Sequence, residues 1–163
     1  MIEEIKDFII KHLQDDAVIA CQENGLQAAI YVHEKKLVEI CQLLRDAPRY
    51  YFDFLANITA VDFYPEPYFE VVYHLSSIPF QKQLTLKVKL AFDRVEGTMP
   101  ELDSVAGVWR TADWHEREIF DLMGIYFRNH PDLRRILMPD DWQGFPLRKD
   151  YIDPETYHDI PVK

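Results

Sequence analysis

The sequence predicts an α+β fold: a two-layer sandwich with helices on one face of a mostly antiparallel mixed sheet, followed by a short helix and an extended C-terminal arm. Three observations favour this fold. Apolar residues recur at helical spacing at 2–13 and 34–46. Apolar and polar residues alternate at 84–90, as in a strand with one buried and one exposed face. After residue 124 neither the helical spacing nor the strand alternation of apolar residues continues.

The first expected element is an amphipathic helix at 2–13, because isoleucines recur there at steps of three and four and acidic residues occupy the first turns. Short β-compatible runs follow at 17–21 and 26–32. They flank Asn24-Gly25, a dipeptide that tolerates the positive φ angles of a tight turn. We therefore expect a strand, a turn and a second strand.

A second helix is expected at 34–46, closed by Pro48. Residues 51–64 are rich in aromatic and β-branched side chains, and two prolines at 65–67 make a turn. Apolar residues alternate at 69–75 and again at 84–90. The order helix, strand, strand, helix, strand, strand, strand predicts the sandwich and leaves room for one parallel pair.

The chain changes character after this sheet. A short helix is expected at 102–109, and a stronger one from 112 to 123, ended by Gly124 as a left-handed cap. We predict two parts on this basis: an α+β domain at 1–110, and a helix with an extended partner-binding arm at 111–163.

The arm is too apolar to prefer water, so docking explains it better than disorder. Prolines, Pro146 among them, pre-set an extended path. Arginine can grip a carboxylate while its stem lies on apolar surface, which suits a desolvated interface. The alternative is a loop that wraps the chain's own domain with ordinary ion pairs. The strong cations between 116 and 151 are Arg117, Arg128, Arg134, Arg135, Arg148 and Lys149.

Composition excludes several classes of protein. A net charge of −10 would repel a phosphate backbone, so nucleic acid is not expected as a partner. No apolar run approaches the about 20 residues of a membrane helix, and we expect a soluble, cytosolic chain without a direct membrane span. Two cysteines without Cys-x-x-Cys spacing cannot hold an iron–sulfur cluster, which would have to belong to a partner.

A metal-dependent enzyme is the main alternative from another class. It would use His115, Glu116, Glu118 and His130, which have suitable ligand atoms. The spacing argues against it, because no second histidine follows His115 by four residues and paired acids are common on solvated helices. No glycine-rich loop follows a strand, and no nucleophile motif is present.

Three blocks in the last third of the chain carry a resemblance. They are 116–127 (EREIFDLMGIYF), 130–137 (HPDLRRIL) and 144–151 (GFPLRKDY). In this order they closely resemble the 30 kDa-type subunit, also called the C subunit, of the proton-pumping NADH:quinone oxidoreductase, respiratory complex I. Related subunits of photosynthetic complexes and membrane-bound hydrogenases share the resemblance. A regulatory interaction module unrelated to respiration is the third interpretation, and it does not explain three matching blocks.

The resemblance implies a non-catalytic structural subunit of the hydrophilic arm of that complex, which transfers electrons from NADH to quinone and translocates protons. It implies that the chain has no active site, metal or cofactor of its own. FMN, iron–sulfur clusters and quinone are expected in partner subunits, and the arm is expected to hold cluster-bearing and quinone-site subunits in place. The expected location is the cytoplasmic face of the cell inner membrane, peripheral through the complex.

The resemblance also assigns roles to residues. Structural ion pairs are expected on the helix at Glu116, Arg117, Glu118 and Asp121. Pairing within the arm or across to a partner is expected at Arg134, Arg135, Arg148 and Asp150. The remaining candidates for structural or partner contacts are His130, Asp132, Pro146 and Lys149.

Overall fold

The computed structural model describes residues 1–13, 15–23 and 27–162. The α-helices of these ranges are α1 (Ile2–Leu13), α2 (Leu37–Asp46) and α3 (Ala112–Met123), with short 3₁₀ turns η1 (Asp15–Ala17) and η2 (Glu34–Lys36). The strands of the main sheet are β1 (Val18–Gln22), β2 (Ala29–Val32), β3 (Phe54–Asp62), β4 (Tyr68–Ser77) and β5 (Lys82–Ala91). The expected turn at Asn24-Gly25 lies outside the described residues.

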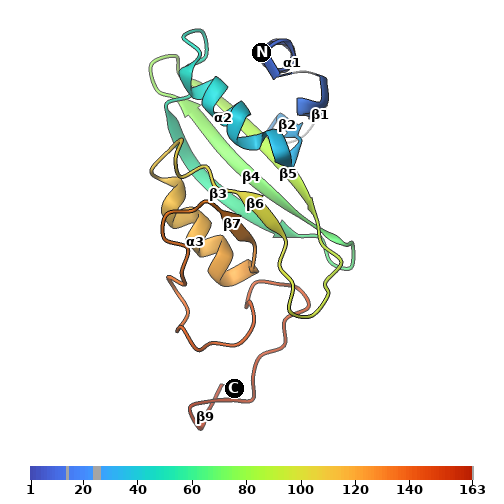
Figure 1. The fold of residues 1–163 in the computed structure, drawn as a ribbon, viewed down its shortest axis with the longest axis vertical. Coiled ribbons are helices and arrows are strands. Elements are labelled where there is room, and N and C mark those ends of the chain that lie inside the picture. Colours follow the sequence, from blue (N-terminus) through green and yellow to red (C-terminus); the bar gives the residue numbers. More distant parts are fainter. Residues whose placement is uncertain (14, 24–26, 163) are drawn as a thin grey trace.

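The five strands form one mixed sheet in the order β1-β2-β5-β4-β3. All neighbours are antiparallel except β2 and β5, which supply the one parallel pair that the sequence left room for. Tyr73 of β4 lies opposite Ile58 of β3 and Leu86 of β5, so these three side chains share a face. Figure 1 shows α2 and α3 over one face of this sheet, which confirms the α+β sandwich.

The core lies between that face and the helices. Alternate residues of β4, from Phe69 to Leu75, are almost fully buried there, together with Ile40 of α2 and Ile119 of α3. The apolar stripe of each helix therefore covers the apolar face of the sheet, as the two periodicities predicted. Helix α3 packs into the same core as α2. The division of the chain into two parts at residue 110 stays a prediction.

The prediction of a helix at 102–109 is wrong. Glu101–Asp103 form strand β6, which pairs in parallel with β7 (Tyr126–Arg128), and a turn follows. Leu102, fully buried, is opposite Phe127 in this ladder. The pairing joins segments on either side of α3, so the local spacing of apolar residues, which resembles a helical stripe, could not reveal it.

The helix predicted at 112–123 is confirmed as α3, and Gly124 ends it in the left-handed conformation (φ 66°). Beyond β7 the arm runs along α3 and past the end of the sheet (Figure 1). The last short strands are β8 (Thr156–Tyr157) and β9 (Ile160–Pro161). Within the described ranges no helix has the length and apolar character needed to cross a bilayer.

Candidate functional site

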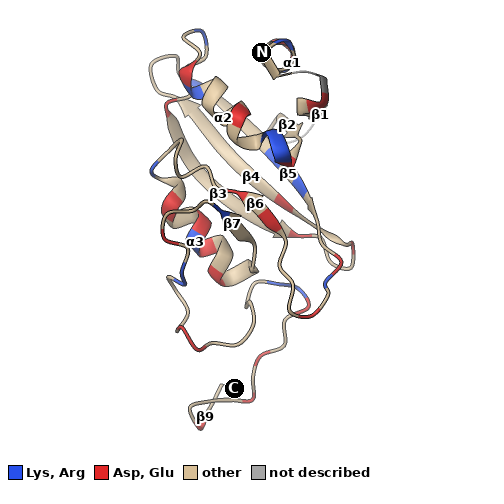
Figure 2. Ribbon diagram, viewed as in Figure 1, with Lys and Arg blue, Asp and Glu red and all other residues tan. Residues whose placement is uncertain are grey.

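Helix α3 is the centre of the candidate site because it buries three charged residues. Glu116 and Asp121 have no exposed surface, and Arg117 is 8% exposed. Helix α3 carries mostly acidic residues, and the arm beside it carries both acidic and basic residues (Figure 2). Buried charges are costly unless they are paired or hydrogen-bonded, so each of these groups must have partners.

Asp121 and Arg135 form the main contact between α3 and the arm. Arg135 Nη1 donates to Asp121 Oδ1 (2.6 Å), and its Nη2 donates to the carbonyls of Trp142 and Gly144 (3.0 and 3.1 Å). The other carboxylate oxygen, Oδ2, accepts three successive arm amides, those of residues 136–138, at 2.7–3.0 Å. Burial opposes ionisation, but these donors together hold the pKa of Asp121 below its ordinary value.

Arg117 fastens the same stretch of arm through neutral acceptors. Its guanidinium donates to the carbonyls of Arg134 and Arg135, at 3.2 and 3.3 Å. The structural ion pair expected at this position is therefore replaced by hydrogen bonds to backbone. Carbonyl oxygens can satisfy an arginine fork just as a carboxylate does, and spacing in sequence cannot tell the two apart.

Arg148 closes the C-terminal end of α3. Its Nε and Nη2 donate to the carbonyls of Met123 and Gly124 (2.7 and 3.0 Å), which the helix leaves without partners. The cation also lies 4.4 Å from the ring centroid of Phe145 and 5.1 Å from that of Phe92. Arg148 thus links the end of α3, the arm and the sheet. Its positive charge lies at the negative end of the helix dipole.

A second group of charges fastens the arm farther along; the sequence singled out its members Lys149 and Asp150 but not Asp62 and Arg94. Asp62, at the end of β3, accepts from Arg94 and from the backbone amide of Lys149, and Arg94 Nη1 also donates to Asp150 (2.9 Å). Burial opposes ionisation of Asp62, but Arg94 and the amides hold its pKa below the ordinary value. The partners are 32 and 87 residues apart in sequence, so no local spacing could have found them.

Glu116 points into the protein. It accepts from the Ser104 hydroxyl and from the Val105 amide (2.7 Å), and the nearest cation-forming group is His130 Nε2 at 3.9 Å. In place of the expected ion pair, Glu116 therefore accepts hydrogen bonds from two uncharged donors in the loop after β6. Burial raises the pKa of Glu116 to about 7, although the two hydrogen bonds oppose this.

His130 is held in one orientation at the start of the arm. Its Nδ1 accepts the amide of Asp132 (3.0 Å), which places the ring proton on Nε2, and Nε2 lies 3.0 Å from the carbonyl of Asp113. Its side chain has no exposed surface. This geometry positions the chain after β7 against the first turn of α3.

The remaining candidates lie outward. Glu118 is exposed and has no hydrogen-bond or ion-pair partner among the described residues. Asp132 and Arg134 pair with each other at 2.9 Å on the surface, and Lys149 is exposed. Pro146 is half-buried.

The residues of the metal-enzyme alternative do not form a ligand set, although His130 Nε2 lies 3.9 Å from Glu116. Glu116 is directed inward and Glu118 outward on the same helix. Within the part of the chain that the structure describes, no group of three or more histidine, cysteine or carboxylate side chains is placed to hold a metal ion.

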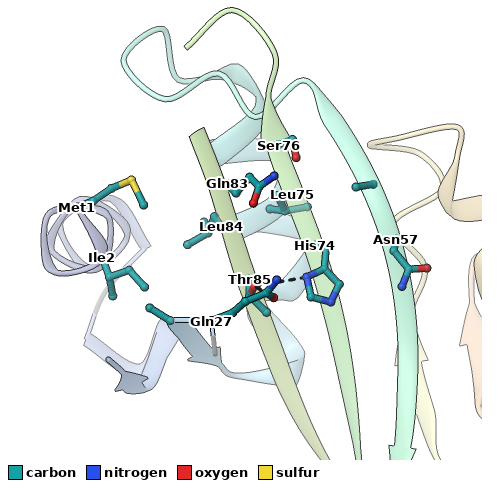
Figure 3. A pocket seen from close by; sticks show the side chains of 12 residues that line it. Met1, Ile2, Gln27, Asn57, His74, Leu75, Ser76, Gln83, Leu84 and Thr85 are labelled. Carbon is teal, nitrogen blue, oxygen red and sulfur yellow. Dashed lines mark hydrogen bonds between the residues drawn. The ribbon is translucent and has the colours of Figure 1, made fainter. Parts of the chain in front are cut away.

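A pocket lies on the open face of the sheet (Figure 3). His74 and Thr85 lie side by side there, with Nδ1 and Oγ1 3.5 Å apart, and Thr85 donates to Gln27 (3.3 Å). The described residues that line it include amides, hydroxyls and one imidazole but no carboxylate or thiol. It lacks the acid–base pair or activated nucleophile that a catalytic site requires.

A protein-family model matches most of the chain. Residues 30–157 match the family model described as "Respiratory-chain NADH dehydrogenase, 30 Kd subunit". The chain belongs to this family. The resemblance noted in the three C-terminal blocks is thereby confirmed, and it extends over most of the α+β domain as well.

Curated relatives within the family are named as the C subunit of NADH-quinone oxidoreductase. The chain is 50% identical over 121 residues to a C subunit of Rhizobium etli, covering 74% of this chain and 62% of that protein. It is 41% identical over 155 residues to the C subunit of Chlorobium phaeobacteroides, covering 94% of this chain and 91% of the relative.

A solved structure shares the fold. A chain in the membrane-bound sulfane sulfur reductase, an archaeal respiratory membrane complex, superposes with a TM-score of 0.72. The match covers 92% of this chain and 85% of that chain at 22% sequence identity. At this identity the likeness concerns the fold alone.

Proposed function

We propose that this chain is a non-catalytic structural subunit of a proton-translocating NADH:quinone oxidoreductase, where it holds neighbouring subunits of the hydrophilic arm at fixed positions. The family match over residues 30–157 carries the proposal. Relatives at 41–50% identity, named as the C subunit of that enzyme, support it. The chain contributes to electron transfer through assembly, because a misplaced cofactor or acid reacts slowly even when its own chemistry is intact.

The geometry of the arm supports a role in docking. Its buried arginines have their hydrogen-bond partners within the chain, which supports an arm that is ordered before a partner binds. Several of its apolar side chains nevertheless face outward: Leu137, Leu147, Ile152 and Ile160 are 59–86% exposed. A pre-ordered backbone with outward apolar residues loses little conformational entropy on binding, which favours a permanent interface.

The cofactors belong, in this proposal, to the partner subunits. FMN, the iron–sulfur clusters and quinone are bound by neighbouring chains, and this chain contacts the subunits that carry the clusters and the quinone site. It then lies on the cytoplasmic face of the inner membrane and is attached through the complex.

Arg148→Ala tests the proposal, because it removes the side chain that joins the end of α3 to the arm. We expect the amount of assembled complex to fall several-fold while NADH:quinone turnover per assembled complex stays near the wild-type value. The measurement is quantification of intact complex by native gel, with turnover normalised to it.

Arg134→Ala is the matched control, because this arginine is 68% exposed and, among the described residues, forms an ion pair with Asp132 alone. It should leave both quantities unchanged. Normal assembly of the Arg148→Ala complex with lost turnover would contradict a purely structural role.

A further inference from the structure

The outer side of β3 is one of the two edges of the main sheet. β3 is the last strand of the order and, in the described ranges, hydrogen-bonds as a strand to β4 alone. Its ladder with β4 is irregular at Leu55/Asn57 and regular from Asn57 to Asp62. The Leu55 carbonyl accepts from Thr111 Oγ1 (3.1 Å), but no described residue outside β4 bonds the backbone of the next residues up to Val61.

From Asn57 to Val61 this edge lacks the bulges, charges and prolines that usually prevent pairing with other chains. Protected edge strands are short or carry lysine or proline. β3 has nine residues, and none before Asp62 is charged or proline. Ile58, Thr59 and Val61 also favour extended structure. The edge is therefore suited to accept another strand.

A groove beside the edge gives room for side chains of such a strand. It measures about 250 Å³ and lies between residues 57–60 of β3 and the C-terminal half of α3. Leu122 and Leu147 line its wall. The Leu147 amide donates to the Leu122 carbonyl (2.9 Å), so the Leu147 side chain, 59% exposed, is held in place rather than left on a loose tail.

The outer face of α3 adds a charge to this groove and carries an aromatic residue one helical turn away from it. Trp114, Glu118 and Leu122 follow at steps of four and so share one stripe of the helix. Trp114 is 69% exposed, and tryptophan is among the residues that most often dominate binding energy. Glu118 lines the groove and has no partner among the described residues, so it is free to pair with a cation.

We propose that the free edge of β3, with the groove between β3 and α3, receives an extended segment of a neighbouring subunit that adds a strand to the sheet. The inference rests on the proposed function. The segment carries a lysine or arginine opposite Glu118 and an apolar side chain against Leu122 and Leu147. Its backbone hydrogen bonds supply affinity, and the charge and the groove supply specificity.

The test uses the full chain, tagged, in the intact complex from its host. Thr59, half-exposed on β3, is replaced by the photocrosslinking amino acid benzoylphenylalanine, and the crosslinked peptide is identified by mass spectrometry. We expect a crosslink to one segment of another subunit with a basic residue. A crosslink to a second copy of this chain, or none in an assembled complex, would overturn the proposal.

Two surface substitutions test the side-chain contacts in the same complex. Glu118→Lys and Leu147→Asp should each reduce the co-purified neighbouring subunit about tenfold, whereas Glu66→Lys should not, since Glu66 is an exposed glutamate in the turn after β3. Circular dichroism of each purified chain confirms that it is folded. Wild-type recovery with both groove variants would contradict the proposal while leaving the structural function intact.

Hydrogen exchange separates this proposal from the proposed function. Amides of residues 57–61 should exchange several-fold more slowly in the complex than in the isolated chain. Equal exchange rates in the assembled complex and in the isolated chain would contradict the added strand and leave the proposed function unaffected. If the wild-type chain co-purifies with no respiratory subunit, both are contradicted.

Discussion

At the scale of single residues, Glu116 and Asp121 are two fully buried carboxyl groups on one helix that titrate in opposite directions. Asp121 faces three amides and a guanidinium, which stabilise its anion and lower its pKa. Glu116 faces one hydroxyl and one amide, which do not compensate for burial, so its pKa rises to about 7. The number of donors around each carboxyl group decides the difference.

Glu116→Gln should remove a pH dependence of stability. The folded pKa of Glu116 is above the unfolded value, so its contribution to stability is present at low pH and is lost as pH rises toward 7. Between pH 5.5 and 7 the wild type should therefore lose about 2 kcal/mol relative to Glu116→Gln. Urea unfolding of the isolated chain across this range measures it. Glu118→Gln, on the exposed side of α3, serves as control, and parallel curves for wild type and Glu116→Gln would refute the assignment.

Asp121→Asn should destabilise the folded chain strongly. The amide group would direct N–H donors at the amides of the arm and leave the Arg135 cation without its carboxylate, a loss that typically costs about 3–5 kcal/mol. Because the pKa of Asp121 is lowered on folding, the same stability should be lost in the wild type as pH falls below the ordinary range of aspartate. Asp132→Asn, whose pair with Arg134 is on the surface, should leave the unfolding curve unchanged.

At the scale of elements, the end of α3 determines where the arm begins. Gly124 has a positive φ, and a Cβ there would lie 2.5 Å from two ring carbons of Phe145 and against Nη2 of Arg148. Only glycine satisfies both the backbone conformation and the close approach. The sequence predicted the cap, but it could not reveal that the arm returns to cover it.

Gly124→Ala should therefore destabilise the chain by about 2–4 kcal/mol, from left-handed strain together with displacement of Phe145 and Arg148. Gly107→Ala is the matched control, since a Cβ at Gly107 would meet nothing within 4 Å. Thermal unfolding of both variants measures the difference. Equal stability of the two would show that the arm does not pack on Gly124 in solution.

Elements with local periodicity were predictable, and those made by distant pairing were not. The stripe of α3 and the alternation of β5 follow from nearest neighbours along the chain, and both are confirmed. The spacing around β6 predicts a helix because the partner strand that decides its conformation lies beyond α3. The same reason explains why Asp62 and Arg94 were missed: long-range charge pairs leave no trace in local spacing.

At the scale of the whole molecule, the chain is a sandwich with an arm folded back on it by three arginines of the 116–151 segment. We expected partners to cover these cations. In the structure their N–H groups donate instead to carbonyls of the same chain and to Asp121. What remains free for partners is apolar surface on the arm, the stripe of α3 and the edge of β3. The arm is therefore fastened to the sandwich by contacts within the chain.

The most direct test of this account is a graded series of arm-loosening variants, Arg148→Ala, Asp121→Asn and Gly124→Ala, studied in the native host. For each variant, the amount of assembled complex and the total NADH:quinone turnover are measured in the same membranes. The account predicts that turnover is proportional to assembled complex, with the wild-type ratio retained throughout. Full assembly with a falling ratio of turnover to complex would contradict it.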